Sequence, residues 1–404
     1  MPNPRHDFYK LWAGQTISEI GSRITREGLP LTAVLVLNAT ATQMGVLAAA
    51  GGAAVLLFSL AAGVIADRMR RRPLMIVADL GRAALLATIP LAAAFGAISF
   101  LQLLIVAVLT GILTVQFDVA YQSYLPAIVP REDLFEGNRR LSMSSATAEI
   151  AGPALTGILI KWITAPIAIL LDAISFVFSA ISIWAIRTSE PILVPAPHES
   201  IWHEASEGAR TIANHPVLRA LALRSISAFL AFGTFQTLYL LYAIRVLHFN
   251  TATLGILISL GGVSSMAGAY FSDRVTRKFG MGQTLVASAL LSGVANLLVP
   301  LAAHDLHYAA LCMGLAQLIG DAGFTIYFVN ETTLRQQMVR DDLLGRVNAA
   351  MQLASRGVLP LGALLGGLLA GPLGISGALW VASAGVLAST LWLLPIRGAI
   401  NYNA

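Results

Sequence analysis

Long apolar runs separated by short polar gaps occupy almost the whole chain of 404 residues. A helix needs roughly 20 apolar residues to cross a bilayer, and twelve runs approach or exceed that length. Bilayer-spanning β-strands would instead alternate apolar with polar residues, whereas residues 45–65 are apolar almost throughout. We therefore predict an all-α integral membrane protein whose twelve transmembrane helices cover residues 11–37, 44–65, 74–96, 99–122, 141–162, 166–186, 217–244, 252–271, 281–303, 307–330, 347–370 and 373–394.

The chain also contains an internal repeat. Residues 67–72 (Asp-Arg-Met-Arg-Arg-Arg) return 206 positions later as residues 273–278 (Asp-Arg-Val-Thr-Arg-Lys), each time in a polar gap between two apolar runs. A second set repeats at an offset of 210, where Asn138, Gly152 and Gly157 are matched by Asn348, Gly362 and Gly367. Repeats in the same orientation predict two pseudo-symmetric six-helix bundles.

The longest polar stretch divides the predicted helices into six and six. It begins with a proline-rich segment and continues with residues compatible with a short surface helix, whose Trp202 and Ile212 could lie at the bilayer surface. We therefore expect an N-terminal bundle at residues 1–186, a cytoplasmic linker at residues 187–216 and a C-terminal bundle at residues 217–404.

Basic residues are unevenly distributed between the two sets of loops. Nineteen of the 26 Lys and Arg residues fall in the segments that share a side with both termini, and only Lys161 and Arg245 fall in the opposite segments. The positive-inside rule therefore predicts cytoplasmic N and C termini.

Composition excludes several classes of function. With 56% hydrophobic and 12% charged residues the chain is far from a soluble domain, and its formal net charge of +5 reflects topology rather than nucleic-acid binding. The single Cys312 and the seven His residues form no spaced metal motif. No catalytic constellation is present, so we expect no enzyme, no metal and no cofactor.

Charges inside the predicted spans are the main candidates for chemistry, because each costs several kcal/mol unless it is paired or faces water. Glu19, Arg23 and Glu27 follow one another at i,i+4 on the first helix, and we expect Glu19 to carry a coupled proton beside Arg23. The alternative is a permanent ion-pair ladder that only orients this helix. Glu149 and Asp321 are the next candidates for proton coupling.

The loop at residues 63–72 resembles the Gly-x-Leu-Ala-Asp-Arg-x-Gly-Arg-Lys motif of the major facilitator superfamily, with Arg70 in place of the second glycine. The resemblance extends over essentially the whole chain and implies alternating access. It also implies a conformational latch in which Asp67 and Arg71 pair with Asp118. We assign this latch to Asp67, Arg68, Arg71, Asp118, Asp273, Arg274, Arg277 and Lys278. The alternative, which we favour for Arg70 and Arg72, is that the basic residues enforce topology and bind anionic lipid.

On the fifth predicted helix, Gly152, Pro153 and Gly157 resemble the Gly-Pro-x-x-Gly-Gly element of proton-exchanging exporters in this superfamily, with Thr156 as a departure. In the superfamily fold, helices one, four, seven and ten line a central cavity. The resemblance therefore implies a substrate cavity at Gln15, Phe232, Phe235, Gln236, Tyr239, Phe324 and Tyr327, although an aromatic stripe is also typical of ordinary helix packing.

Phrases before the fifth and eleventh helices resemble the branch of macrolide-efflux and siderophore-export proteins. This resemblance implies a secondary active transporter that exports a hydrophobic or amphipathic small molecule by proton antiport across a bacterial inner membrane. We expect it to be a multi-pass monomer in contact with lipid. The alternatives are an importer or lipid facilitator of the same fold and, with less support, a non-transporting membrane receptor.

Overall fold

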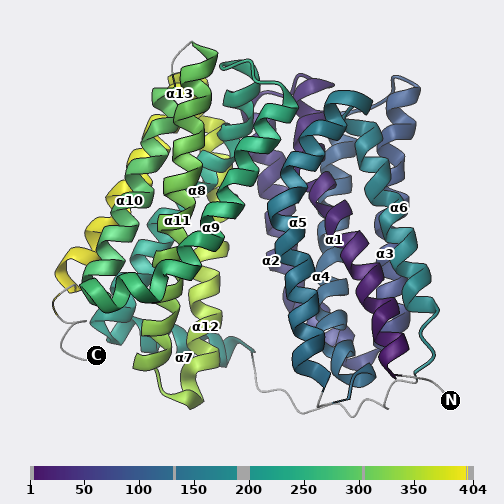
Figure 1. Ribbon diagram of the computed structural model, residues 1–404, viewed down its shortest axis with the longest axis horizontal. Coiled ribbons are helices and arrows are strands. Elements are labelled where there is room, and N and C mark those ends of the chain that lie inside the picture. Colours follow the sequence, from purple (N-terminus) through teal and green to yellow (C-terminus); the bar gives the residue numbers. More distant parts are fainter. Residues whose placement is uncertain (1–3, 131–132, 189–200, 303–304, 397, 399–404) are drawn as a thin grey trace. The chain divides into compact units, whose positions relative to one another are not determined.

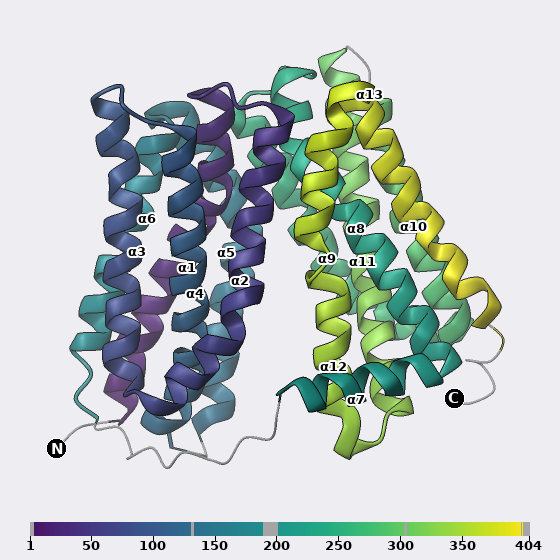
Figure 2. The ribbon, with the colours of Figure 1, turned by 180° about the vertical axis from the view of Figure 1, so that it is seen from behind.

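The computed structural model describes residues 4–130, 133–188, 201–302, 305–396 and 398. Within these ranges the side chains of residues 4–5, 59–68, 123, 127, 201–205 and 342 are not described. The described residues form helices joined by short connections and contain no strand (Figures 1 and 2). The all-α prediction is therefore confirmed.

Each predicted span overlaps a helix. The helices are α1 (Pro4–Leu35), α2 (Ala41–Arg68), α3 (Arg71–Ala94), α4 (Phe100–Ile128), α5 (Leu134–Ile163), α6 (Ala165–Trp184), α7 (Ile201–Asn214), α8 (Pro216–Arg245), α9 (Thr251–Phe279), α10 (Met281–Leu301), α11 (Leu306–Met338), α12 (Asp341–Arg356), α13 (Leu359–Ala388) and the 3₁₀ helix η2 (Ser389–Ile396).

Nine stretches of the described chain are long and apolar enough to cross a membrane. The last of them, Leu343–Ile396, is 54 residues long and includes α12, α13 and η2. Helices α1 and α5 are not among the nine, because the charges described above interrupt their apolar character. The chain is a multi-pass membrane protein.

Near the C-terminus, helix boundaries differ from the predicted ones. The predicted helix at residues 347–370 is interrupted after Arg356, because Pro360 has no N–H to donate and its ring would clash with the Arg356 carbonyl in a continuous helix. Within α13, Gly374 has φ 70° and ψ 170°, a backbone conformation that glycine adopts without strain. This residue marks the turn between the last two predicted spans.

Contacts divide the chain into two compact units. Unit 1 contains Met1–Ala39, Ala50–Ala196 and Asn250–Ser259, and unit 2 contains Thr40–Ala49, Pro197–Phe249 and Leu260–Ala404. The start of α2 therefore packs within unit 2, and the start of α9 packs within unit 1.

Each unit has its own core. In unit 1, Leu11, Met75 and Tyr124 are fully buried where α1, α3 and α4 meet. In unit 2, Leu221 and Leu285 occupy the equivalent position in a cluster that also includes residues of α11 and α12. In lipid such packing is stabilised by close van der Waals contact rather than by release of water.

Helix α7 forms where a short surface helix is predicted, but its environment differs from that expectation. Ile212 is buried in the core of unit 2 and does not lie at a bilayer surface. The apolar face of this amphipathic helix packs on α8 and α12, and Glu207 forms an ion pair with Arg346 (Figure 2).

The sequence repeat corresponds to a repeated contact between helices. In unit 1 the Thr251 hydroxyl donates to the Gly157 carbonyl at 2.9 Å, and in unit 2 the Thr42 hydroxyl donates to the Gly367 carbonyl at 3.1 Å. A Cβ on Gly157 would clash with the Thr251 carbonyl, and one on Gly367 would lie 2.9 Å from the Thr42 Cα. Glycine is thus required at both crossings because backbone meets backbone.

We predict that Gly157→Ala destabilises the protein by about 1–3 kcal/mol, because overpacking forces α5 away from α9. The thermal midpoint of the detergent-solubilised chain measures this effect. Gly371→Ala is the matched control, since a Cβ there meets nothing within 4 Å. An equal midpoint for both variants would contradict the requirement.

Candidate transport site

Helix α1 packs closely on α6 in unit 1 through three glycines spaced seven residues apart. Gly14 faces Ser179 and Ser182, Gly21 faces Asp172 and Ser175, and Gly28 faces Ile169. A seven-residue spacing keeps small residues on one helix face, which allows the two backbones to approach each other. This contact fixes the direction in which the polar side chains of α1 point.

Some polar residues of α1 bind α6 directly. Gln15 is buried, and its Nε2 donates to the Ser179 hydroxyl at 3.3 Å. The Thr25 hydroxyl donates to the buried carboxylate of Asp172. The structure therefore places Gln15, a predicted cavity residue, in a contact inside unit 1.

The ion pair of Arg23 crosses from α1 to α5. Its guanidinium contacts the Glu149 carboxylate, and the Arg26 guanidinium lies 3.9 Å from the same group. The described partner of Arg23 is thus on another helix and not in the ion-pair ladder along α1 that is the alternative to proton coupling at Glu19. Gly152 allows this crossing, because a Cβ there would lie 2.6 Å from the Cβ of Arg23.

Glu19 interacts electrostatically with groups of α4. It lies within electrostatic range of both Asp118 and Tyr121, and Asp118 is also within range of Arg82. Among the described side chains Glu19 has no ion pair. Two carboxylates from different helices therefore share one polar region inside unit 1.

The nearby pair Asp79 and Arg82 is structural. Both side chains are buried and form an ion pair on α3. The Arg82 guanidinium lies between the rings of Phe117 and Phe176, 4.6 Å and 4.1 Å from their centroids. The ion pair and the two aromatic rings therefore compensate the buried charges of Asp79 and Arg82.

In unit 2, Asp321 stands apart from basic groups. Its carboxylate packs against Gly261 of α9. A Cβ at position 261 would clash with this carboxylate. No hydrogen bond or ion pair to Asp321 is present among the described residues. Asp321 is thus a carboxylate inside a spanning helix that the described part of unit 2 does not neutralise.

The predicted aromatic residues of α8 and α11 gather in unit 2. The ring centroids of Phe232 and Phe235 lie 6.3 Å apart in a stacked pair, and those of Phe235 and Tyr239 lie 5.8 Å apart. Phe324 and Phe229 form an edge-to-face pair with centroids 6.3 Å apart. The amide of Gln317 donates to the Tyr239 hydroxyl at 3.4 Å.

The members of this aromatic set differ in exposure. Phe232, Gln236 and Phe324 are exposed on unit 2, whereas Phe235 and Tyr239 are buried behind them. Tyr327 is also buried, and the guanidinium of Arg224 lies 3.7 Å from its ring centroid. Phe232, Gln236 and Phe324 are therefore the predicted cavity residues that unit 2 presents on its surface.

The structure brings together part of the predicted latch. Asp273 and Arg277, both assigned to the latch, form an i,i+4 ion pair on α9, although both side chains are largely exposed. Arg274 lies 4.7 Å from the ring centroid of Tyr270, and Lys278 lies 5.3 Å from that of Phe279. The side chains of Asp67 and Arg68 lie outside the described residues. The latch therefore stays a prediction.

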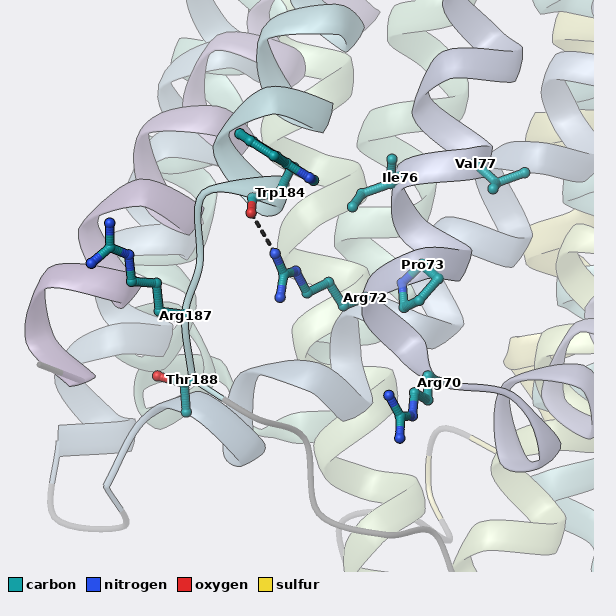
Figure 3. Close-up of a pocket in the computed structure, with 8 residues that line it drawn as sticks. All are labelled: Arg70, Arg72, Pro73, Ile76, Val77, Trp184, Arg187 and Thr188. Atoms are coloured by element: carbon teal, nitrogen blue, oxygen red, sulfur yellow. Dashed lines mark hydrogen bonds between the residues drawn. The ribbon is translucent and has the colours of Figure 1, made fainter. Parts of the chain in front are cut away.

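The described residues contain no group of three or more His, Cys, Asp or Glu side chains that could hold a metal ion. They do form a cavity of about 530 Å³ at the end of unit 1 where α3 begins and α6 ends (Figure 3). Three arginines line it, and none of the predicted transport residues does.

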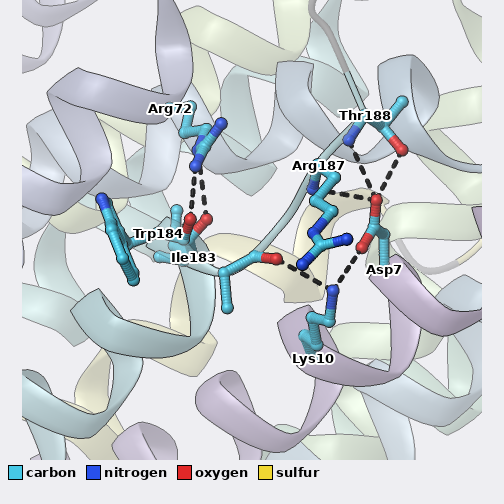
Figure 4. A network of polar contacts seen from close by, with 8 residues as sticks. Asp7, Lys10, Arg72, Ile183, Trp184, Arg187 and Thr188 are labelled. Carbon is cyan, nitrogen blue, oxygen red and sulfur yellow. Dashed lines mark hydrogen bonds and ion pairs between the residues drawn. The ribbon is translucent and has the colours of Figure 1, made fainter. Parts of the chain in front are cut away.

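Beside this cavity, Asp7 joins the start of α1 to the segment after α6 (Figure 4). Its carboxylate accepts from Lys10 Nζ at 2.7 Å, from the backbone N–H of Arg187 at 3.0 Å and from the N–H and hydroxyl of Thr188 at 2.9 Å and 2.7 Å. Burial alone would raise the pKa of Asp7, but these donors outweigh it and lower the pKa from 3.8 to about 2.

This arrangement, with the charged helix α1 among apolar helices, is typical of a membrane transporter. The sequence profile described as "Transmembrane secretion effector" matches residues 2–399, and the chain belongs to this family of the major facilitator superfamily.

Relatives of established name are similar over most of the chain. Macrolide efflux protein A of Streptococcus pyogenes is 24% identical over 380 residues, which cover 91% of this chain and 90% of that protein. Multidrug efflux pump Tap of Mycolicibacterium fortuitum is 26% identical over 367 residues, which cover 88% of this chain and 87% of that protein.

Solved structures share the fold. A bacterial homologue of the iron transporter ferroportin matches with a TM-score of 0.80 at 14% identity, covering 97% of this chain and 98% of that one. The nucleoside transporter NupG matches with a TM-score of 0.71 at 10% identity, covering 98% of each chain. These structures show the fold, while the sequence profile and the efflux relatives confirm the predicted superfamily and a role with small-molecule substrates in a membrane.

We predict that Asp7→Asn lowers stability at pH 7 by about 2 kcal/mol, the free energy that corresponds to the lowered pKa. Because the folded-state pKa lies below the ordinary value, this contribution is full above about pH 4 and is lost as the pH falls toward 2. The difference in unfolding midpoint between wild type and variant should narrow over that range.

Asp305→Asn provides the control for Asp7→Asn. The Asp305 side chain accepts from the Tyr308 N–H at the start of α11, a capping role that asparagine fills equally well. A constant difference between Asp7→Asn and wild type from pH 7 to pH 2 would refute the ionic origin of the stabilisation.

Proposed function

We propose that this chain exports a hydrophobic or amphipathic small molecule by proton antiport with alternating access, in a bacterial inner membrane with both termini in the cytoplasm. Two efflux proteins match about nine-tenths of the chain, and this likeness is the observation that carries the export assignment. The polar region inside unit 1 supports coupling to protons.

Glu19 and Asp118 are the proposed proton site. Glu19 of α1 and Asp118 of α4 lie within electrostatic range of each other, and like charges that share a site repel. Arg82 is already paired with Asp79, and Arg23 is paired with Glu149. Glu19 has no ion pair among the described residues. Uptake or release of a proton at Glu19 therefore changes the net charge of this region. Asp321 offers a second such carboxylate in unit 2.

The α5 element connects this charge to helix packing. Pro153 cannot donate a backbone hydrogen bond, and the next residue, Ala154, donates its N–H to the Ser259 hydroxyl of α9 at 3.0 Å. Immediately before Pro153, Gly152 faces the aliphatic part of the Arg23 side chain. The Arg23–Glu149 pair and the Ala154–Ser259 contact thus lie within two helical turns of each other on α5, which connects a change in that pair to the contact with α9.

The aromatic surface of unit 2 is the proposed substrate contact. Phe232 and Phe324 expose ring area on neighbouring helices, with Gln236 as a polar group beside them. Such a surface suits a bulky amphipathic ligand better than a sugar, which needs many more hydrogen-bonding groups.

An importer or a lipid facilitator of the same fold is the alternative function. Neither would require proton release when substrate is added to purified protein, and an importer would move substrate in the opposite direction. The direction of transport in proteoliposomes separates these functions from export.

We predict that purified wild-type protein releases protons when a hydrophobic cationic drug is added, and that Glu19→Gln abolishes this release. The glutamine keeps the shape of the side chain but cannot ionise. A pH-sensitive dye in weakly buffered detergent solution measures the release. Glu136→Gln is the matched control, because Glu136 is an exposed acid paired with Arg139 and Arg140.

Release that is unchanged in Glu19→Gln but lost in Asp321→Asn would move the coupling to unit 2. Drug transport that persists in proteoliposomes after the pH gradient is collapsed would sink the antiport mechanism itself.

We also predict that cells expressing the protein accumulate less of a fluorescent amphipathic dye, and that Phe232→Ala with Phe324→Ala weakens export. Removal of two contact rings should raise the half-saturating dye concentration about tenfold. Phe95→Ala is the control, since Phe95 is 84% exposed at the end of α3 and belongs to unit 1. An equal effect of the control would remove the aromatic surface from the substrate path.

A further inference from the structure

The cavity at the end of unit 1 has a strongly basic half. It is lined by Arg70, Arg72, Pro73, Ile76, Val77, Trp184, Arg187 and Thr188, and no acidic side chain is among them (Figure 3). The Arg72 Nε donates to the Ile183 carbonyl at 3.2 Å, and the same guanidinium contacts the Trp184 carbonyl. Backbone carbonyls at the end of α6 thus hold one of the three guanidinium groups in place.

The other two guanidinium groups have no such partner. Arg70 and Arg187 are exposed, and neither side chain has an ion pair among the described residues. The carboxylate of Asp7, close to Arg187 in Figure 4, already accepts hydrogen bonds from Lys10, Thr188 and the backbone N–H of Arg187. The cavity therefore presents positive charge that the described part of the protein does not neutralise.

The other half of the cavity is apolar and continues along two helices. Val77 on α3 and Trp184 on α6 are 64% and 71% exposed, and these two helices pack against each other. One turn further from the arginines, Leu80 and Ile181 are also exposed on the same two helices. A Trp at the junction of charged and apolar surface is typical of the membrane–water interface.

We propose that this cavity binds an anionic phospholipid, with the phosphate between Arg70, Arg72 and Arg187 and an acyl chain along Val77 and Trp184. The charged half of the cavity lies next to its apolar half. This arrangement favours a lipid over a free phosphate, because only a lipid fills both halves. The predicted cytoplasmic location of these arginines also places them at the leaflet that carries anionic lipid. The site is independent of the proposed export function.

Bound lipid has a structural consequence for unit 1. Its phosphate neutralises Arg70 at the start of α3 and Arg187 after α6, so one molecule bridges the two ends. Asp7 of α1 also binds this segment, through the backbone N–H groups of Arg187 and Thr188. Removal of anionic lipid should therefore loosen the attachment of this segment without altering Glu19 or Asp118.

The test uses the full chain in nanodiscs that contain phosphatidylglycerol with brominated acyl chains in a phosphatidylcholine background. Bromine quenches tryptophan on contact, and the signal of Trp184 is the difference between wild type and Trp184→Phe. We expect half-maximal quenching of Trp184 at an about 30-fold higher phosphatidylglycerol fraction in Arg70→Gln/Arg187→Gln, since each basic residue contributes about fivefold. Arg72 is left intact because it holds α6.

Arg210→Gln/Arg219→Gln is the matched control, as it removes two exposed arginines from unit 2 and should leave the Trp184 signal unchanged. An equal loss in this control, or equal quenching by brominated phosphatidylcholine alone, would overturn the proposal. So would relief of the quenching by millimolar inorganic phosphate, because the cavity would then take free phosphate. These outcomes do not depend on whether the protein exports a drug.

Discussion

The absence of water inside the bilayer is the constraint on which the rest of this structure depends. A charged side chain there must find its partner inside the protein, and helix α1 carries more such charges than its apolar residues can offset. It is therefore enclosed by α4, α5 and α6. Two of these contacts satisfy polar groups of α1, since α6 binds Thr25 and Gln15 and α5 binds Arg23. Helix α4 instead places Asp118 within electrostatic range of Glu19.

Small residues make this enclosure possible. Apolar side chains gain little when they move from lipid tails to a helix interface. Close packing of helix backbones and polar contacts between helices therefore provide the stability. The glycines of α1 bring α6 near, and Gly152 lets the stem of Arg23 cross α5. Further along α5, Gly157 forms with Thr251 the same crossing that Gly367 forms with Thr42. The same physical solution thus serves both units.

Two regions of unit 1 then carry different chemistry. Inside the spans, Arg23 pairs with Glu149 and Arg82 with Asp79, whereas Glu19, in the proposed proton site, has no ion pair among the described residues. At the end of the unit, arginines outnumber acids and stand beside exposed apolar side chains, which suits a lipid phosphate. Position along the helices separates the two: a charge within a span must be compensated by neighbours, whereas a charge at the interface can be compensated by the membrane.

The sequence by itself determined the all-α class, the superfamily and the positions of nearly all helices, because apolar length and local repeats are one-dimensional signals. It also placed Asp273 and Arg277 in one predicted latch, and these two residues pair within one helix. Only the tertiary structure decided the partners on different helices. Arg23 selects Glu149 over its own neighbours, and Ile212 enters a core rather than the bilayer surface. Such choices depend on which helix faces approach each other, and spacing along a chain contains no information about distance between helices.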